Sequence, residues 1–221
     1  MSLALAPDIS FVEQDGERIF LDLARDRYFA LGAAADGAFT ALMRGKPDEQ
    51  QRGRLHALVE RGVLVDLPFG DNPRPCRQPY VDRSACDGAT VSVSLWRTLN
   101  ASWSIARAKH GLKTRSLRSN VRRLEHLKAV TAPDVHRPYD GEREAVAAAY
   151  RAAGRLVATL DECLAVSFAM ALHCLAKGLD AQLSIGVKLR PFEAHAWVVV
   201  DGMVVSDRLD NVRPFSTILL I

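Results

Sequence analysis

Cysteine and long apolar runs are both scarce in this chain of 221 residues. Its four cysteines, Cys76, Cys86, Cys163 and Cys174, lack the paired CxxC spacing of zinc sites and are too few for a disulfide scaffold of this size. We therefore expect reduced thiols and no bound metal. No stretch approaches the ~20 apolar residues that a membrane-spanning helix needs. The first residues also lack the basic flank and apolar run of a secretory signal, so the expected location is the cytoplasm.

Charge is nearly balanced over the whole chain but uneven along it. The formal net charge is only +3 at pH 7, whereas residues 97–128 carry nine lysines and arginines against a single acidic residue, Glu125. Such a run is typical of the solvated faces of helices. It also suits binding to an acidic partner or to nucleic acid, and the sequence leaves these alternatives open.

In the first part of the chain, apolar and polar residues alternate as they do in β-strands. Further along, the apolar residues recur at helical spacing. The dipeptide Asp15-Gly16 favours a tight hairpin turn, and the apolar runs around it predict strands. The expected strands cover residues 9–12, 19–23 and 28–31, and the expected helices cover residues 33–42 and 54–63. Three short strands followed by short helices indicate a small winged-helix-like unit.

The helix expected at residues 54–63 is a poor reader of DNA. It mixes charges and lacks the cluster of Asn, Gln and Arg that contacts base edges. A small sheet, in contrast, exposes an edge strand, and an edge beside an apolar helix can capture an extended peptide as an added strand. Peptide binding is therefore at least as good an interpretation of this unit as DNA binding.

Helices are expected to dominate the middle of the chain. Prolines and polar residues indicate that residues 67–89 form a linker. Apolar spacing then predicts helices over residues 91–109, 116–130 and 141–160, with a break at Gly111. Trp96 and Trp103 are seven residues apart and share one helix face, which predicts core positions rather than a ligand platform.

A small, apolar helix is expected to begin near Cys163. The free N–H groups and the dipole of a first helical turn favour thiolate over thiol, so Cys163 is the candidate nucleophile. Asp161 and Glu162 would raise the pKa of that thiol if they pointed at it, and we expect them to face solvent or cap the helix. Cys174 is expected to be a buried hydrophobe, and His173 a packed or surface residue.

A hairpin downstream supplies a base and an acid. His195 lies in an apolar strand, and Asp207 follows the returning strand beyond the turn Asp201-Gly202. The two side chains come close whether the strands pair regularly or carry a one-residue bulge at the turn. A carboxylate beside the imidazole fixes its orientation, and the imidazolium in turn stabilises a thiolate. Cys163, His195 and Asp207 therefore predict a nucleophilic triad.

Two stretches of the first part carry a family resemblance. Residues 20–31 contain FLDL and RYFAL, and residues 58–64 read LVERGVL. They resemble the PqqD-like precursor-recognition domains of pathways that modify ribosomally made peptides, in which the leader adds to the third strand and packs against the last helix. The resemblance implies a peptide-binding surface made of Tyr28, Phe29, Leu31, Leu55, Leu58 and Val59. Because alternate strand residues must fill the core, we expect about half of these to face the peptide.

The triad region carries a second resemblance. Cys163-Leu164 followed by Ser167, then His195-Ala196-Trp197-Val198 and Asp207, resemble the peptidase part of the lasso-peptide biosynthesis B proteins and, more widely, transglutaminase-like and papain-like cysteine hydrolases. The resemblance implies an α+β fold with a small winged-helix-like N-terminal domain and a transglutaminase/papain-like helical and antiparallel-sheet domain. The implied boundaries are residues 1–66 for precursor recognition, 67–89 for the linker and 90–221 for the peptidase.

These observations predict a cytoplasmic cysteine endopeptidase that hydrolyses the leader–core bond of a lasso precursor peptide. The resemblance also implies an asparagine-synthetase-like, ATP-dependent cyclase as a partner, and it implies no metal or organic cofactor. Three alternatives stay open. They are a transglutaminase-like acyl transferase or amidase with another substrate, a winged-helix nucleic-acid-binding protein, and a non-catalytic adaptor that presents a precursor peptide.

Overall fold

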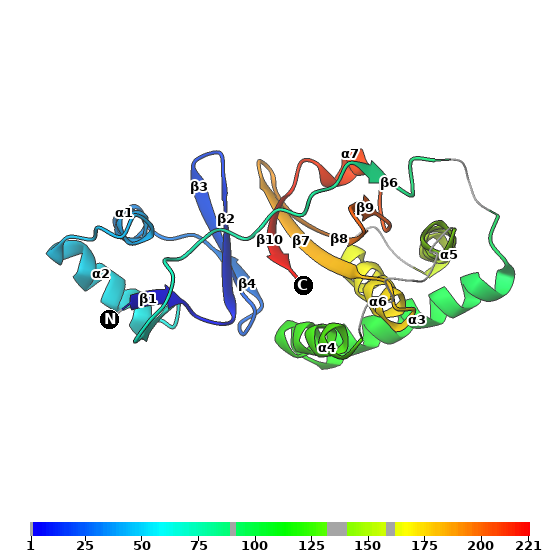
Figure 1. Cartoon of the computed structure of the whole chain (residues 1–221), viewed down its shortest axis with the longest axis horizontal. Helices are drawn as coiled ribbons and strands as arrows, with labels where there is room; N and C mark the ends of the chain where they lie inside the picture. Colours follow the sequence, from blue (N-terminus) through cyan, green and yellow to red (C-terminus); the bar gives the residue numbers. More distant parts are fainter. Residues whose placement is uncertain (1, 89–91, 132–140, 158–161) are drawn as a thin grey trace. The chain divides into compact units, whose positions relative to one another are not determined.

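The computed structural model describes residues 2–88, 92–131, 141–157 and 162–221, and it has a mixed α+β fold (Figure 1). The chain divides into two compact units, Met1–Arg77 and Gln78–Ile221. Each unit has a hydrophobic core of its own, and the two are described separately. Within the described ranges, no helix is long and apolar enough to cross a lipid bilayer.

The first unit consists of two small sheets and two helices. Its strands are β1 (Ser2–Leu5), β2 (Ile9–Gln14), β3 (Glu17–Asp22), β4 (Arg27–Phe29) and β5 (Leu64–Leu67), and its helices are α1 (Ala33–Met43) and α2 (Glu49–Glu60). β2, β3 and β4 form an antiparallel sheet in that order, and β1 pairs with β5. The expected hairpin turn is confirmed, because Asp15 and Gly16 have φ angles of 52° and 80°.

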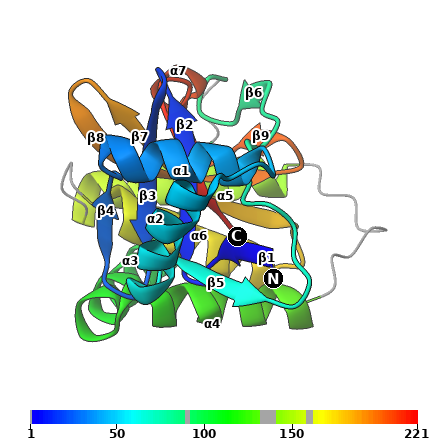
Figure 2. The same ribbon diagram turned by 90° about the vertical axis from the view of Figure 1, so that its left-hand side faces the viewer.

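An aromatic cluster joins the three-stranded sheet to α1. Phe11 of β2 and Phe20 of β3 stack on each other, and each meets the ring of Phe39 edge-on with ring centroids 5.2 Å apart. All three side chains are fully buried, so α1 lies across β2 and β3 (Figure 2). Leu55 and Leu58 of α2 complete the same core.

The helix α2 begins five residues before its expected start at Arg54. Asp48 accepts a hydrogen bond from the Gln51 backbone N–H (2.7 Å), and the Gln51 side chain accepts one from the Asp48 N–H (2.9 Å). This capping box fixes the first turn at Glu49. Apolar spacing missed the start because the first residues of α2 are polar.

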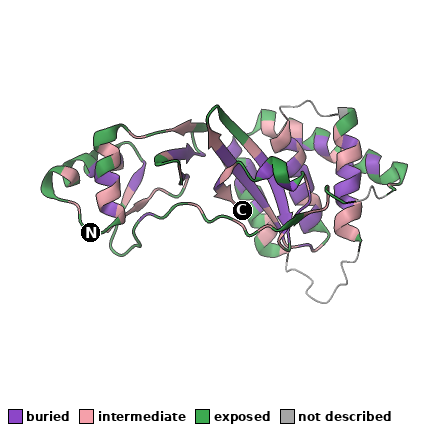
Figure 3. Cartoon of the chain, turned by 90° about the horizontal axis from the view of Figure 1, so that it is seen from above, coloured by how far each residue is buried: buried purple, intermediate pink, exposed green. Residues whose placement is uncertain are grey.

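In the second unit, the long helices pack on one side of a five-stranded sheet, and one short helix packs on the other side. The helices are α3 (Leu95–Thr114), α4 (Leu117–Val130), α5 (Glu142–Val157), α6 (Cys163–Ala176) and the short α7 (Leu209–Val212). The strands are β6 (Arg83–Ser84), β7 (Ala181–Leu189), β8 (Phe192–Val200), β9 (Met203–Val204) and β10 (Ser216–Leu220), in the order β10-β7-β8-β9-β6. α6 lies against β7 and β8, and α3 packs on α5 and α6 (Figure 1). The buried residues gather where these helices meet the sheet (Figure 3).

Two expectations for the helical region are wrong. α3 continues through Gly111, because that glycine lies against α4 and its carbonyl accepts a hydrogen bond from the Asn120 side chain (3.3 Å). Trp96 and Trp103 are 78% and 59% exposed rather than in the core, since Ala101, Ile105 and Ala108 form the buried face of α3. Residue 91 and residues 158–160 of the expected helices lie outside the described residues.

The segment expected to be a linker is tied to both units. The backbone N–H of Cys76 donates to the carbonyl of Phe11 in β2 (2.8 Å). The Gln78 side chain exchanges two hydrogen bonds with the backbone of Thr217 in β10, at 2.7 and 3.0 Å. Further on, β6 pairs in parallel with β9. The expected linker therefore contains a strand, β6, which is too short to show a period in the sequence.

Candidate active site

The thiol of Cys163 lies at the first residue of α6, as expected. The helix is apolar and packs its buried residues against the sheet and α3, which leaves its first turn half-buried at the edge of the core. Of the two acidic neighbours, Glu162 is the N-cap residue and forms an ion pair with Lys109. That pairing directs the Glu162 carboxylate to a cation on α3. Asp161 lies outside the described residues.

Three groups converge on the sulfur of Cys163. The His195 side chain forms a hydrogen bond with it, and the backbone N–H groups of Leu164 and Ala196 donate to it. Burial raises the pKa of the Cys163 thiol, but the hydrogen bonds and the charge of His195 outweigh burial, so its pKa lies below the ordinary value. The donor Ala196 directly follows His195 in β8, and no sequence pattern points to its role.

His195 is held between the thiol and a carboxylate. Its Nε2 atom lies 2.7 Å from Oδ2 of Asp207. This contact leaves Nδ1 as the ring nitrogen that can face Cys163. Burial lowers the pKa of His195, but the partners Asp207 and Cys163 raise it to about 9. The imidazole is therefore set to carry a proton at neutral pH, next to a thiol that readily gives one up.

Asp207 is oriented by neighbours of its own. Its Oδ1 atom accepts hydrogen bonds from the backbone N–H of Arg208 (2.7 Å) and from Nδ2 of Asn211 (2.8 Å). Burial raises the pKa of the Asp207 carboxyl, but these donors and His195 lower it below its usual range. Asn211 was missed in the sequence. Its spacing of four residues from Asp207, which precedes the N-cap of α7, is the signal that points to it.

The hairpin that carries His195 follows the regular register. Val200 pairs with Met203 and Val199 with Val204, around the turn Asp201-Gly202 with its positive φ angles of 49° and 74°. The backbone N–H of Val205 then donates to Val198 (2.9 Å). The contact of His195 with Asp207 therefore needs no bulge at the turn.

Residues of the expected linker support the acid. The hydroxyl of Ser84 in β6 donates to the backbone carbonyl of Asp207. Asp87 accepts hydrogen bonds from the Leu209 backbone N–H (3.3 Å) and from Nε of Arg208 (3.2 Å). These contacts fix the backbone carbonyl of Asp207 and the two residues that follow it.

A ring stack fixes the plane of the His195 imidazole. Trp197 stacks with it at 6.2 Å between centroids, and Phe215 lies 5.3 Å away. The Trp197 ring passes directly over Gly186, the residue that pairs with His195 across β7 and β8. A Cβ atom at Gly186 would stand 2.5 Å from Cη2 of Trp197, so only glycine leaves room for this ring.

The other candidate side chains lie apart from the site. Cys174 is 1% exposed, and burial raises its pKa to about 12, which confirms it as a buried hydrophobe. His173 is packed rather than reactive: its Nδ1 lies 3.3 Å from the Tyr150 hydroxyl, and burial lowers its pKa. The described residues hold no cluster of three or more side chains suited to bind a metal ion.

The expected peptide-binding residues of the first unit separate into two groups. Leu55 and Leu58 are fully buried in the core, which corrects their assignment to a surface. The partly exposed members are Tyr28, Phe29, Leu31 and Val59. β4 forms one edge of its sheet, whereas the opposite edge strand, β2, is bonded to Cys76.

Comparisons with known proteins cover the two parts of the chain unequally. The sequence model of the family described as "Transglutaminase-like superfamily" matches residues 91–220, more than half of the chain. The "Microcin J25-processing protein McjB" of Escherichia coli is 41% identical over 47 residues, which are 21% of this chain and 23% of that protein. The match thus spans about a quarter of that relative. No solved structure matches the chain.

The pairing of thiol and imidazole predicts the pH dependence of Cys163 alkylation. Because the Cys163 pKa is lowered and that of His195 is about 9, the thiolate–imidazolium pair should persist from below the ordinary thiol midpoint of ~8.5 up to about pH 9. His195→Ala removes the hydrogen bond and the charge, so the midpoint should rise. Iodoacetamide labelling followed by peptide mass spectrometry measures both profiles. A midpoint that is the same in both proteins would contradict the pairing.

Gly186→Ala tests the support of the imidazole. The added methyl group forces the Trp197 ring to shift, and His195 should shift with it. We expect the alkylation rate of Cys163 at pH 7 to fall by about tenfold, since small displacements of reacting groups carry large rate penalties. Gly154→Ala in α5 is the matched control, because a Cβ there meets nothing within 4 Å. The control should keep the full rate, and an equal rate in both variants would refute the role of the ring stack.

Proposed function

The chain belongs to the transglutaminase-like superfamily, and from this premise we propose that it is a cysteine endopeptidase that removes the leader of a lasso precursor peptide. The observation that carries the proposal is the contact of His195 with both Cys163 and Asp207. A thiol held by an imidazole, which a carboxylate orients, is the arrangement of an activated cysteine nucleophile.

In the proposed reaction, the Cys163 thiolate attacks the carbonyl carbon of the leader–core bond. The C–N bond then breaks, and the imidazolium of His195 gives its proton to the leaving amine. A water molecule, deprotonated by His195, hydrolyses the resulting thioester and frees the thiol. Asp207 keeps the imidazole oriented through both steps. The backbone N–H of Cys163, in the first turn of α6, is the proposed donor to the oxyanion.

A peptide substrate is supported by two further observations. The partial relative from Escherichia coli is, by its name, a processing protein. In the first unit, the edge strand β4 presents partly exposed apolar residues, and a leader can add to this edge as a strand. A leader held there raises the local concentration of the scissile bond at Cys163.

The partners follow from the resemblance in the sequence. The released core peptide is proposed to pass to an asparagine-synthetase-like, ATP-dependent cyclase, with both reactions in the cytoplasm. The proposed chemistry uses no metal or organic cofactor, because the thiol, imidazole and carboxylate supply the nucleophile, the proton and its orientation.

Acyl transfer or amidase chemistry on another substrate is the nearest rival, because the same thioester can react with an amine instead of water. The masses of the products distinguish them. Leader cleavage adds water across a backbone bond and gives two peptides, an amidase adds water and releases ammonia or a small amine, and transfer joins the acyl group to an amine.

Cys163→Ala should abolish cleavage of a precursor peptide. Removing the nucleophile is expected to lower kcat by at least about a thousandfold, as loss of a triad member does. Mass spectrometry of the leader and core fragments provides the measurement. Cys76→Ala, in the first unit, is the matched control and should cleave normally. Cleavage by Cys163→Ala at the control rate would contradict the proposed mechanism.

Leader binding should depend on the exposed part of the apolar set. Tyr28→Asp or Val59→Asp is expected to weaken binding of a labelled leader peptide by about tenfold, because a carboxylate must be desolvated against an apolar chain. His56→Asp is the control on the exposed side of α2. Fluorescence polarisation measures the Kd values. Unchanged affinity in both test variants would exclude this surface. Leu55 and Leu58 are unsuitable test positions, since they support the core.

A further inference from the structure

The structure separates the basic run of residues 97–128 into paired and unpaired cations. Arg97 forms an ion pair with Glu142, Lys109 with Glu162 and Lys128 with Asp180. In the described part of the chain, Arg107 and Arg123 form no ion pair. The guanidinium of Arg107 instead lies over the ring of Trp103, 4.6 Å from its centroid. These two arginines are therefore available to an external anion.

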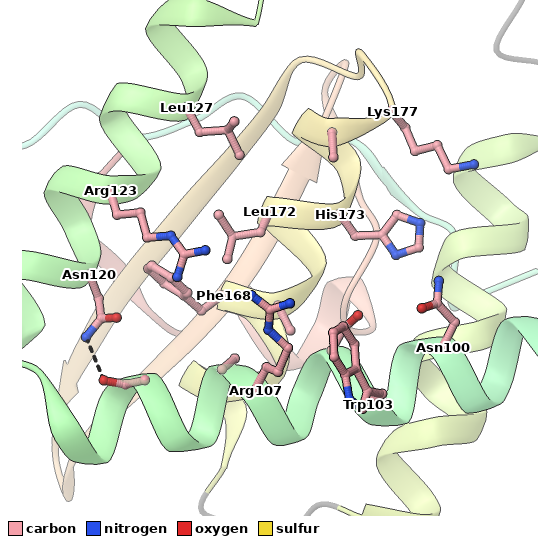
Figure 4. Close-up of a pocket in the computed structure, with 15 residues that line it drawn as sticks. Asn100, Trp103, Arg107, Asn120, Arg123, Leu127, Phe168, Leu172, His173 and Lys177 are labelled. Carbon is pink, nitrogen blue, oxygen red and sulfur yellow. Dashed lines mark hydrogen bonds between the residues drawn. The ribbon is translucent and has the colours of Figure 1, made fainter.

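Arg107 and Arg123 stand at the rim of a cavity between α3, α4 and α6. Its volume is about 420 Å³. The side chains of Phe168 and Leu172 from α6 line it together with Leu127 from α4, and the two arginines reach over it from α3 and α4 (Figure 4). No aspartate or glutamate is among the described residues that line it. The cavity thus combines an apolar wall with positive charge at its rim.

This cavity is separate from the candidate active site. Its lining residues on α6 run from Phe168 to Lys177, whereas Cys163 begins that helix and its sulfur faces Ala196 of β8. Phe168, the lining residue on α6 nearest in sequence to Cys163, lies five residues along the helix, a rise of about 7.5 Å at 1.5 Å per residue, and the cavity opens toward α3 and α4 rather than β8. A ligand in the cavity would not touch the thiol.

The surroundings of the cavity favour a ligand larger than a simple anion. A second hollow of about 400 Å³ shares Trp103, Arg107 and Arg123 with it and adds Arg115. Along α3, the exposed side chains of Trp96 and Leu99 continue the face that carries Trp103. Exposed tryptophans and arginines around an apolar pocket are the side chains that contribute most to polypeptide interfaces.

We propose that this cavity binds an acidic segment of a partner polypeptide, with one large apolar side chain inserted between Phe168 and Leu172. Carboxylates beside that side chain pair with Arg107 and Arg123, whose planar guanidinium groups suit them. Nucleic acid fits less well, because its phosphates need a track of cations, whereas here the cations flank an apolar wall. The site does not depend on the reaction proposed for Cys163.

The binding test uses the full chain with Cys163→Ala, so that its outcome is independent of any cleavage. The probe is a short labelled peptide in which one phenylalanine is flanked by glutamates. The matched probes carry lysines in place of the glutamates, or alanine in place of the phenylalanine. A labelled single-stranded oligonucleotide is the rival ligand. Fluorescence polarisation gives the Kd of each.

The acidic phenylalanine peptide should bind at least about tenfold more tightly than either matched peptide. Arg107→Gln with Arg123→Gln should raise its Kd by about tenfold or more, because two charge-assisted hydrogen bonds are lost. Arg122→Gln, on the same helix but outside the cavity, is the control and should leave the Kd unchanged. Equal binding of the three peptides, an unaffected double variant, or tighter binding of the oligonucleotide would each overturn the proposal.

Discussion

The contact of α6 with β8 is the constraint on which the candidate site depends. Ala196 of β8 contributes both of its backbone polar groups to this contact. Its carbonyl accepts a hydrogen bond from the Ser167 hydroxyl (2.8 Å), and its N–H donates to the Cys163 sulfur. Because Ser167 is buried on α6 and His195 directly precedes Ala196, one helix turn and one strand residue fix the thiol beside the imidazole. The Asp207 and Asn211 contacts then only have to orient a ring that is already in place.

The features of this site that the sequence predicted are those with a local cause. The start of α6 at Cys163 and the turn at Asp201-Gly202 follow from short-range spacing and from φ preferences, and both are present. The N–H of Ala196 carries no such signal, because it comes to the sulfur only through packing of a strand on a helix. Trp103 was misplaced for a related reason: helical spacing identifies a shared face, but not which face meets the core.

In the first unit, too, the sequence pattern identified apolar residues without showing which of them are buried. Alternation and helical spacing identified β2, β3 and α1, whose phenylalanines form the core. They could not divide the six apolar candidates into ligand-facing and core-facing groups. Leu55 and Leu58 share their core with Leu64 of β5 and with Leu3 and Leu5 of β1, two strands that no sequence pattern predicted. Which apolar side chains of this unit are buried therefore depends on how its strands and helices pack together.

The boundary between the two units falls at Arg77 and Gln78. Cys76 is hydrogen-bonded to β2 and Gln78 to β10, so Arg77 is the one residue between two that bond to strands of different units. Dividing the chain at this peptide would keep each of these hydrogen bonds within one polypeptide. A cut only ten residues later would remove Ser84 from the half that carries Asp207 and leave the acid without its support.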